Sequence, residues 1–326
     1  LATSTIITMS SSHWILAWLG LELNTLAILP IMMNNHHPRS TEATTKYFII
    51  QALAAASILL ASTLNAWTTG TWSLMHTCSS PTTTIATIAI MLKLGVAPVH
   101  LWYPDVLQGS TMITAALVTT WQKLAPLSLL YLMHNTNPNV LLATGLASIA
   151  MGGWTGLNQT QTRKIMAFSS IAHTGWLLTA MTCSLPLTTL TMLTYIAMTI
   201  AVFITLHTTK AKTLPDLGTT WTLSTPLLAS LMVTVASLGG LPPLTGFLPK
   251  WMISKELITH QLTPIITLLL LCSLPSLYFY TRMAYTMTLT SPPTTTMNKM
   301  NWRLPSNMPL TLPHLIILSW LSMPLA

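Results

Sequence analysis

Hydrophobic residues follow one another in about eleven long blocks with short polar connections between them. A membrane-spanning helix needs roughly 20 apolar residues, because each residue rises 1.5 Å and the hydrocarbon layer is about 30 Å thick. The blocks cover about residues 1–11, 13–33, 44–66, 83–102, 110–132, 138–158, 163–183, 188–208, 225–258, 262–285 and 308–326. Runs such as Ile85–Leu92 are apolar on both faces, which argues against the alternating strands of a barrel. The pattern predicts an all-α polytopic membrane protein, with residues 1–326 forming a single transmembrane domain.

Composition supports the same class of protein. Of 326 residues, 51% are hydrophobic and only 6% are charged, with a mean hydropathy of +0.61. A soluble domain carries about 25% charged residues because its surface must be hydrated, so a soluble enzyme is excluded. The largest basic cluster is the pair Arg163 and Lys164, whereas binding to nucleic acid takes a concentrated basic face. We therefore expect lipids, and no nucleic acid, as partners.

The basic residues of the connections give a test of the segment count. The connections after segments 2, 6, 8 and 10 carry Arg39 and Lys46, Arg163 and Lys164, Lys210 and Lys212, and Lys299 and Arg303. The connections after segments 3, 5, 7 and 9 carry no clear lysine or arginine. With this count every basic connection lies on one side of the membrane, as the positive-inside rule requires.

Two segments are interrupted by glycine and proline. The fourth contains KLGVAP at Lys93–Pro98, and the ninth contains GGLPPLTG at Gly239–Gly246. Proline removes a backbone donor and clashes with the preceding turn, which frees carbonyl groups at membrane depth. Each break is the fourth member of a five-helix set, and five is an odd number. The sequence thus predicts inverted repeats over about 1–132 and 138–285, followed by a C-terminal helix at about 308–326; ordinary proline kinks are the alternative.

Four charged residues cannot be assigned to connections. Glu22, Lys93 and Lys123 lie deep inside predicted segments, and Lys250 follows the second break. Each charge at the bilayer centre costs at least about 2.5–3.5 kcal/mol, so an intramembrane charge indicates a functional pathway by default. We expect these four residues to form a proton relay.

The types of these residues suit proton transfer. Burial disfavours the charged form of a lysine, and a nearby carboxylate favours it. At about 5 Å and an effective dielectric constant of about 20, Glu22 and Lys93 would attract each other by about 3 kcal/mol. Joining or separating the pair would therefore load or release a proton; a static ion pair is the alternative.

His173, in the middle of segment 7, is a further candidate for relaying protons between Lys123 and Lys250, and a packed neutral histidine is its alternative.

The sequence shows no pattern for a bound metal or cofactor. Cys78, Cys183 and Cys272 are isolated, without CxxC spacing, and no GxGxxG or Walker motif occurs. We expect no flavin, haem, nucleotide or metal on this chain. The chain begins at Leu1 without a cleavable signal peptide, so we expect it to start inside its first helix.

Six strings resemble one known family. They are WLGLELN at Trp18–Asn24, NHHPRSTE at Asn35–Glu42, MLKLGVAPVHLWYP at Met91–Pro104, TWQKLAP at Thr120–Pro126, GLNQTQTRK at Gly156–Lys164 and SLGGLPPLTGFLPKW at Ser237–Trp251. Together they resemble the antiporter-like membrane subunits of vertebrate mitochondrial NADH:ubiquinone oxidoreductase, respiratory complex I. The resemblance covers nearly the whole chain and is highly specific.

The resemblance implies both a role and a setting. It implies a core membrane-arm subunit that contributes to proton translocation, with Glu22 and Lys93 as the carboxylate–lysine pair, Lys123 as the central lysine and Lys250 on the second broken helix. It further implies an obligate hetero-oligomer with other membrane-arm subunits in the mitochondrial inner membrane, with the basic connections facing the matrix. NADH, FMN, iron–sulfur clusters and ubiquinone would belong to partner subunits, leaving no redox site in this chain.

Two other functions are open at this point. The subunit could be a scaffold that transmits electrostatic coupling without itself completing a proton transfer. It could also be a free-standing cation/proton antiporter of the related Mrp type, which the close match to the mitochondrial strings disfavours.

Overall fold

A computed structural model describes residues 1–34, 36–74, 80–133, 136–220 and 225–288, together with residues 313, 316 and 317. These residues form α-helices and connections, with no β-strand among them. The chain divides into two compact units, residues 1–148 and 149–326. Except for residues 313, 316 and 317, the predicted C-terminal helix at about 308–326 lies outside the described residues, as do Lys299, Arg303 and Cys78.

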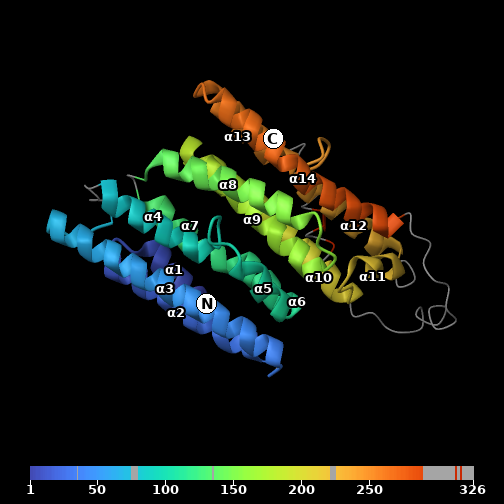
Figure 1. Cartoon of the computed structure of the whole chain (residues 1–326), viewed down its shortest axis with the longest axis horizontal. Helices are drawn as coiled ribbons and strands as arrows, with labels where there is room; N and C mark the ends of the chain where they lie inside the picture. The colour runs from blue at the N-terminus through green and yellow to red at the C-terminus, as the bar shows by residue number, and fades with distance from the viewer. Residues whose placement is uncertain are drawn as a thin grey trace. The chain divides into compact units, whose positions relative to one another are not determined.

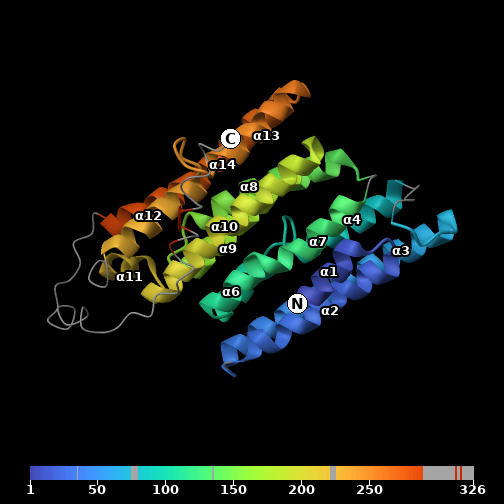
Figure 2. The same cartoon turned by 180° about the vertical axis from the view of Figure 1, so that it is seen from behind.

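The first unit is built around one long helix, α3. Its helices are α1 (Ala2–Ser10), α2 (Trp14–Met33), α3 (Pro38–Thr69), α4 (Ser80–Leu94), α5 (Trp102–Gly109), α6 (Met112–Thr119) and α7 (Trp121–Leu132), and α8 (Pro138–Gly156) begins in this unit. Helix α3 packs against α2, α4 and α5 (Figure 1). The view from behind in Figure 2 shows α1, which packs against α2 and α7.

The described part of the second unit contains the end of α8 and the six helices α9 to α14. They are α9 (Thr162–Cys183), α10 (Leu185–Thr209), the short α11 (Leu214–Thr219), α12 (Thr225–Gly239), α13 (Phe247–Thr259) and α14 (Thr263–Thr288). Helix α10 packs against α9 and α12, and α12 packs against α14. Helix α13 contacts α9, α10 and α14, so the segment after the second break is enclosed by three helices.

Several helices suit a bilayer by length and surface. Within the described residues, α2, α3, α10 and α14 are long and apolar enough to cross a membrane. Large apolar side chains such as Leu53 and Leu193 are 59% and 68% exposed, as expected of residues that face lipid. Many buried threonine and serine hydroxyl groups donate inside their own helices, as where Thr174 donates to the Ile171 carbonyl at 2.8 Å. No water is needed for these groups at membrane depth.

The structure confirms both predicted helix breaks. Helix α4 ends at Leu94 and α5 begins at Trp102, while α12 ends at Gly239 and α13 begins at Phe247. Gly95 and Gly240 follow the first halves with φ of +69° and +82°. Glycine reaches this left-handed conformation without the steric cost of a Cβ, and this ends each helix.

Two helices extend further than the apolar pattern predicts. Helix α3 begins at Pro38 rather than near residue 44, because His37 and Ser40 form a capping box and Pro38 stands at its first position. Arg39 and Lys46 therefore lie on the first turns of α3 rather than in a connection. Beyond the first break, the chain to Gly109 is helical because α5 buries one apolar face.

The prediction of one helix over 110–132 is wrong. Helix α6 ends at Thr119 and α7 begins at Trp121, with Thr120 at φ −110° and ψ −66° between them. The hydroxyls of Thr119 and Thr120 both donate to the Ala116 carbonyl, at 3.0 and 2.7 Å. Pro126 lies inside α7, where it leaves the Gln122 carbonyl without the amide donor that a regular helix would supply. The interruption lies three residues before Lys123.

Candidate functional site

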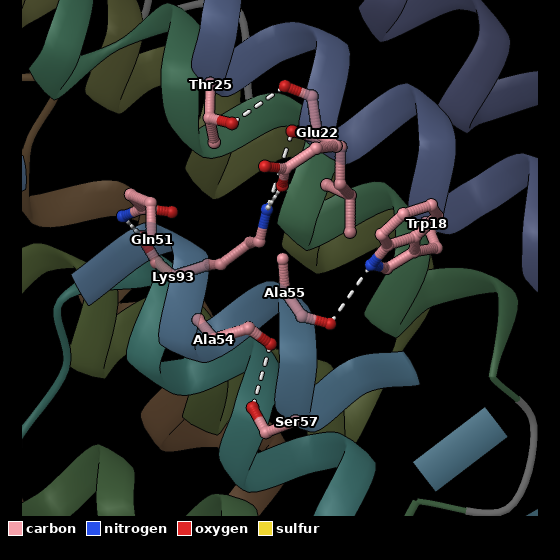
Figure 3. A network of polar contacts seen from close by, with 9 residues as sticks. Trp18, Glu22, Thr25, Gln51, Ala54, Ala55, Ser57 and Lys93 are labelled. Carbon is pink, nitrogen blue, oxygen red and sulfur yellow. Dashed lines mark hydrogen bonds and ion pairs between the residues drawn. The ribbon is translucent and has the colours of Figure 1, made fainter. Parts of the chain in front are cut away.

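Glu22 and Lys93 come from neighbouring helices of the first unit. Glu22 lies in the middle of α2 and Lys93 in the last turn of α4, and the Lys93 Nζ is 4.0 Å from the Glu22 Oε2 (Figure 3). The same Nζ lies 3.5 Å from the Leu21 carbonyl oxygen. The Lys93 side chain is 2% exposed and that of Glu22 is 26% exposed. The predicted neighbours thus form a largely buried pair, and their role in proton transfer stays a prediction.

Contacts with α3 hold this pair in place. The Gln51 Nε2 donates to the Lys93 main-chain carbonyl at 3.2 Å, and the Trp18 Nε1 donates to the Ala55 carbonyl at 3.1 Å (Figure 3). The first bond joins α3 to α4, and the second joins α2 to α3. Lys93 also lies at the C-terminal end of its helix, where the helix dipole favours a positive charge.

Lys123 borders a cavity that it shares with Lys93. The cavity measures ≈ 20 Å³, and its lining includes Asn24, Gln51, Tyr103 and Gln122 beside the two lysines. A space of this size holds a water where polar groups surround it. The Lys123 side chain is buried, and its Nζ lies 5.5 Å from the centroid of the Tyr103 ring, within range of a cation–π contact. The structure thus brings Glu22, Lys93 and Lys123 to one polar region.

Lys250 has a different environment in the second unit. Its Nζ donates to the Gly239 carbonyl, the last of α12, at 3.0 Å. In the described part of the chain no carboxylate lies within 4.0 Å of this nitrogen. A Cβ at Gly240 would lie 2.9 Å from the Lys250 Nζ, so the glycine leaves the space that the lysine occupies.

His173 and Lys250 line the same cavity of the second unit. This cavity also measures ≈ 20 Å³ and includes Thr191, Thr194 and Tyr195. The His173 Nε2 lies 3.4 Å from the Tyr280 hydroxyl, and its ring lies 5.5 Å from that of Tyr195. His173 therefore has both polar and aromatic neighbours beside Lys250. Lys123 belongs to the first unit, and a relay from it through His173 stays a prediction.

Models of two protein families together match almost the whole chain. The model described as NADH:quinone oxidoreductase/Mrp antiporter, TM, matches residues 11–275, which include all five predicted site residues. The model described as NADH dehydrogenase subunit 2 C-terminus matches residues 277–326.

Curated proteins extend the match to full length. NADH-ubiquinone oxidoreductase chain 2 of Tetraodon nigroviridis is 50% identical over 304 residues, 93% of this chain and 87% of that protein. The protein of the same name from Polypterus ornatipinnis is 47% identical over 327 residues, 100% of this chain and 94% of that protein. The chain belongs to the NADH-ubiquinone oxidoreductase chain 2 family.

Solved structures show the fold of this chain 2 family member. A chain of respiratory complex I from Thermus thermophilus, solved with bound aureothin, has a TM-score of 0.86 and 25% identity, covering 98% of this chain and 75% of that chain. A chain of the Mrp complex from a Dietzia species has a TM-score of 0.80 at 17% identity, covering 90% and 60%. The second likeness concerns the fold alone, and both confirm the antiporter-like membrane fold.

Several residues around the five predicted ones were not predicted from the sequence. Gln51 and Tyr103 contact Lys93 and Lys123, and Tyr280 contacts His173. Gln51 had a detectable signal, because it is a lone amide near the start of the apolar segment 44–66. The tyrosines had none, since tyrosine is common at the ends of membrane helices.

Among the described residues, no three His, Cys, Asp or Glu side chains form a group that would hold a metal ion. Cys183 and Cys272 are free thiols in the second unit.

Proposed function

We propose that this chain is a core membrane-arm subunit of mitochondrial NADH:ubiquinone oxidoreductase. In this role it contributes to proton translocation across the inner membrane, coupled to electron transfer from NADH to ubiquinone. Support comes from the family of the chain, whose curated members carry the name of that enzyme. The chain would be a subunit of a redox enzyme without a redox site of its own.

The buried pair of Glu22 and Lys93 is the observation that carries the proposal. A separation of 4.0 Å in a site with 2% exposure of the lysine is close enough for strong electrostatic coupling. It is also longer than a tight charge-assisted hydrogen bond of about 2.8 Å, so the pair is not locked. A small displacement of Lys93 would change how firmly it holds its proton.

Lys123, His173 and Lys250 extend the proposed relay. Lys93 and Lys123 border one cavity with room for water, and His173 and Lys250 border another. Water between such groups carries protons by hydrogen-bond exchange, so each cavity supplies one short step. The proposal assigns each lysine the role of a proton carrier and His173 the role of an intermediate carrier in the second unit.

Inverted repeats are part of the proposal. A single β-bridge joins His13 to Ser73 in the first unit, and another joins Gln161 to Thr213 in the second. Each bridge joins the connection before the second helix of its predicted repeat to the connection before the fourth. The matching positions support two copies of one five-helix plan, with broken helices as their fourth members.

We further propose the inner mitochondrial membrane as the location, with Arg39 and Lys46 at the start of α3 and the basic connections facing the matrix. Partners would be other membrane-arm subunits and lipids. NADH, FMN, iron–sulfur clusters and ubiquinone would be bound by partner subunits.

Replacement of Lys123 by methionine tests the proposal. The assembled complex carrying Lys123→Met is placed in lipid vesicles, and the number of protons moved per electron is measured with a pH-sensitive dye while NADH is oxidised. We expect a lower proton-to-electron ratio, because methionine keeps the length of the side chain and removes its exchangeable proton.

An unchanged ratio in a fully assembled Lys123→Met complex would refute proton conduction and favour the scaffold role. Cation-dependent proton exchange by the isolated chain in vesicles would instead favour a free-standing antiporter.

A further inference from the structure

The broken helix α4 leaves main-chain carbonyls that need partners. The last four carbonyls of any α-helix receive no hydrogen bond from an N–H group of the same helix. At membrane depth water is too scarce to replace these donors. Two of the four in α4 are satisfied within the break itself, because Gly95 N–H donates to the Leu92 carbonyl and Val96 N–H donates to the Met91 carbonyl, each at 3.2 Å. The carbonyl of Lys93 follows these two in sequence and is satisfied from another helix.

Its partner is the side chain of Gln51. The amide nitrogen of Gln51 donates to the Lys93 carbonyl at 3.2 Å, and the two residues are 3% and 6% exposed. Because the acceptor is a carbonyl, the orientation of the amide is fixed, with Nε2 toward α4. Figure 3 shows Gln51 on one side of Lys93 and Glu22 on the other.

Besides Asn65 near the end of α3, Gln51 is the buried side-chain amide of this helix. Its buried neighbours along α3 are Tyr47, Ala54, Ala55 and Ile58, and the alanines let α4 approach closely. A buried amide in such a stripe costs free energy unless it is hydrogen-bonded. This amide donates to the Lys93 carbonyl at the break, so the position of Gln51 matches the break.

We infer that Gln51 is a positioning residue for Lys93: its amide caps the broken helix at the carbonyl of the lysine itself and so fixes the point from which the lysine side chain reaches Glu22. The inference deepens the proposed function and rests on it. The backbone of Lys93 is tied to α3, whereas its Nζ extends toward α2, where Leu21 and Glu22 lie. The ammonium group can then move relative to Glu22 while the main chain stays in place.

The test uses Gln51→Met in the assembled complex in vesicles. Methionine has nearly the length and volume of glutamine but no donor, so the packing of α3 is kept and the cap is lost. An unsatisfied buried carbonyl weakens this arrangement, and we expect the rate of NADH-driven proton translocation to fall about fivefold. The matched control is Ser62→Ala on the same helix, where the lost hydroxyl bonds only to the Leu59 carbonyl at 2.7 Å. This control is expected to change the rate by less than about twofold.

A double variant separates positioning from a purely structural role. If Gln51 acts through Lys93, then Gln51→Met lowers translocation in the wild-type background and has no further effect in a Lys93→Met background. Equal losses in both backgrounds, or a rate equal to that of Ser62→Ala, would overturn the inference. If Gln51→Met does not assemble, Gln51→Leu, which also removes the amide donor and adds no charge, is measured in the same way with the same outcomes.

The same measurements keep the two proposals apart. Full translocation by the Lys93→Met complex would refute the proposed function itself. Loss of translocation in Lys93→Met, with normal translocation in Gln51→Met, would refute only the role of Gln51.

Discussion

Each unit contains a broken helix with a lysine beside the break, but the two lysines lie on opposite sides of their breaks. Lys93 ends the first half of its helix, and Lys250 lies in the second half of the other. Lys93 has a carboxylate partner at 4.0 Å, while its carbonyl is capped by an amide from α3. Lys250 itself caps the end of α12 through the Gly239 carbonyl at 3.0 Å.

The difference concerns the source of negative charge. In the first unit a side-chain carboxylate balances the lysine, and the break is capped separately. In the second unit the C-terminal end of α12 supplies both the acceptor and the partial negative charge of the helix dipole. A carboxylate can be protonated or moved away, whereas a helix end cannot, so the two lysines respond to different changes in their surroundings.

The largest effect is expected from Glu22→Gln. Removing one partner of a largely buried ion pair leaves Lys93 without its counter-charge, and partial exposure of Glu22 moderates the cost to about 2 kcal/mol. We expect a lower denaturation midpoint of the assembled complex and a lower proton-to-electron ratio. The midpoint is measured by heating the detergent-solubilised complex, and the ratio in vesicles.

Glu256→Gln is the matched control for this variant. Glu256 lies on α13 with Lys250, but its carboxylate accepts hydrogen bonds from the Ser184 hydroxyl at 3.1 and 3.0 Å and does not pair with the lysine. We expect a loss of at most about 1 kcal/mol and an unchanged ratio. If both glutamine variants behaved alike, the proposed difference between the units would be wrong.

Gly240→Ala is expected to have the next largest effect, in the second unit. A left-handed conformation costs a residue with a Cβ about 1–2 kcal/mol, and here the new Cβ would also meet the Lys250 Nζ at 2.9 Å. We expect the lysine to be displaced from the Gly239 carbonyl and proton translocation to fall toward the level of Lys250→Met. Both rates are measured in vesicles.

Gly70→Ala is the control that separates backbone strain from the contact between the new Cβ at position 240 and the Lys250 Nζ. Gly70 ends α3 with a φ of +68°, but a Cβ there would meet no atom within 4 Å. Its replacement therefore introduces the same backbone strain without touching a lysine. We expect a similar loss of stability and normal translocation, and reduced translocation in this variant would show that strain alone explains the effect of Gly240→Ala.

Patterns that involve consecutive residues could be predicted from the sequence. The glycine–proline runs at Lys93–Pro98 and Gly239–Gly246 predict both breaks, because backbone chemistry at these residues does not depend on distant parts of the chain. Charge at membrane depth likewise identifies Glu22 and Lys93 as candidates. Their separation of 4.0 Å depends on how α2 and α4 pack on α3, and no local pattern determines that packing.

The break at Thr120 was not predicted because its cause is weak and local. Threonine pairs and prolines are common in membrane helices without interrupting them, so Thr119, Thr120 and Pro126 give no distinct signal. The capping role of Gln51 depends on a contact between residues 42 positions apart. An amide in an apolar segment marks the residue, as it does Asn65, but only the packing of α3 against α4 identifies the partner of Gln51.

The smallest expected effect concerns two short helices, α5 and α11. On α5 of the first unit, Asp105 pairs with Lys46 at 3.3 Å, and both side chains are more than 40% exposed. On α11 of the second unit, Asp216 accepts from the backbone amides of Thr213 and Lys212 at 2.9 and 3.2 Å. Partial burial raises the pKa of the Asp216 carboxyl, but the hydrogen bonds from Thr213 and Lys212 and the Lys212 charge outweigh it, so the pKa lies below its ordinary value.

Because the pKa of Asp216 is lowered, the stabilisation that this carboxylate gives to α11 changes with pH in a defined direction and range. Its stabilisation is fully present above the ordinary aspartate pKa of about 3.9 and is lost as pH falls through the lower folded value. We expect Asp216→Ala to remove about 1 kcal/mol of capping and to speed hydrogen exchange of the Lys212 and Thr213 amides about fivefold. At each pH, the exchange rate in Asp216→Ala is divided by the rate in the wild-type protein. This ratio should be equal at pH 7 and pH 5, since Asp216 is ionised at both. A ratio that already shrinks between these values would mean that a group with a higher pKa, and not Asp216, controls the start of α11.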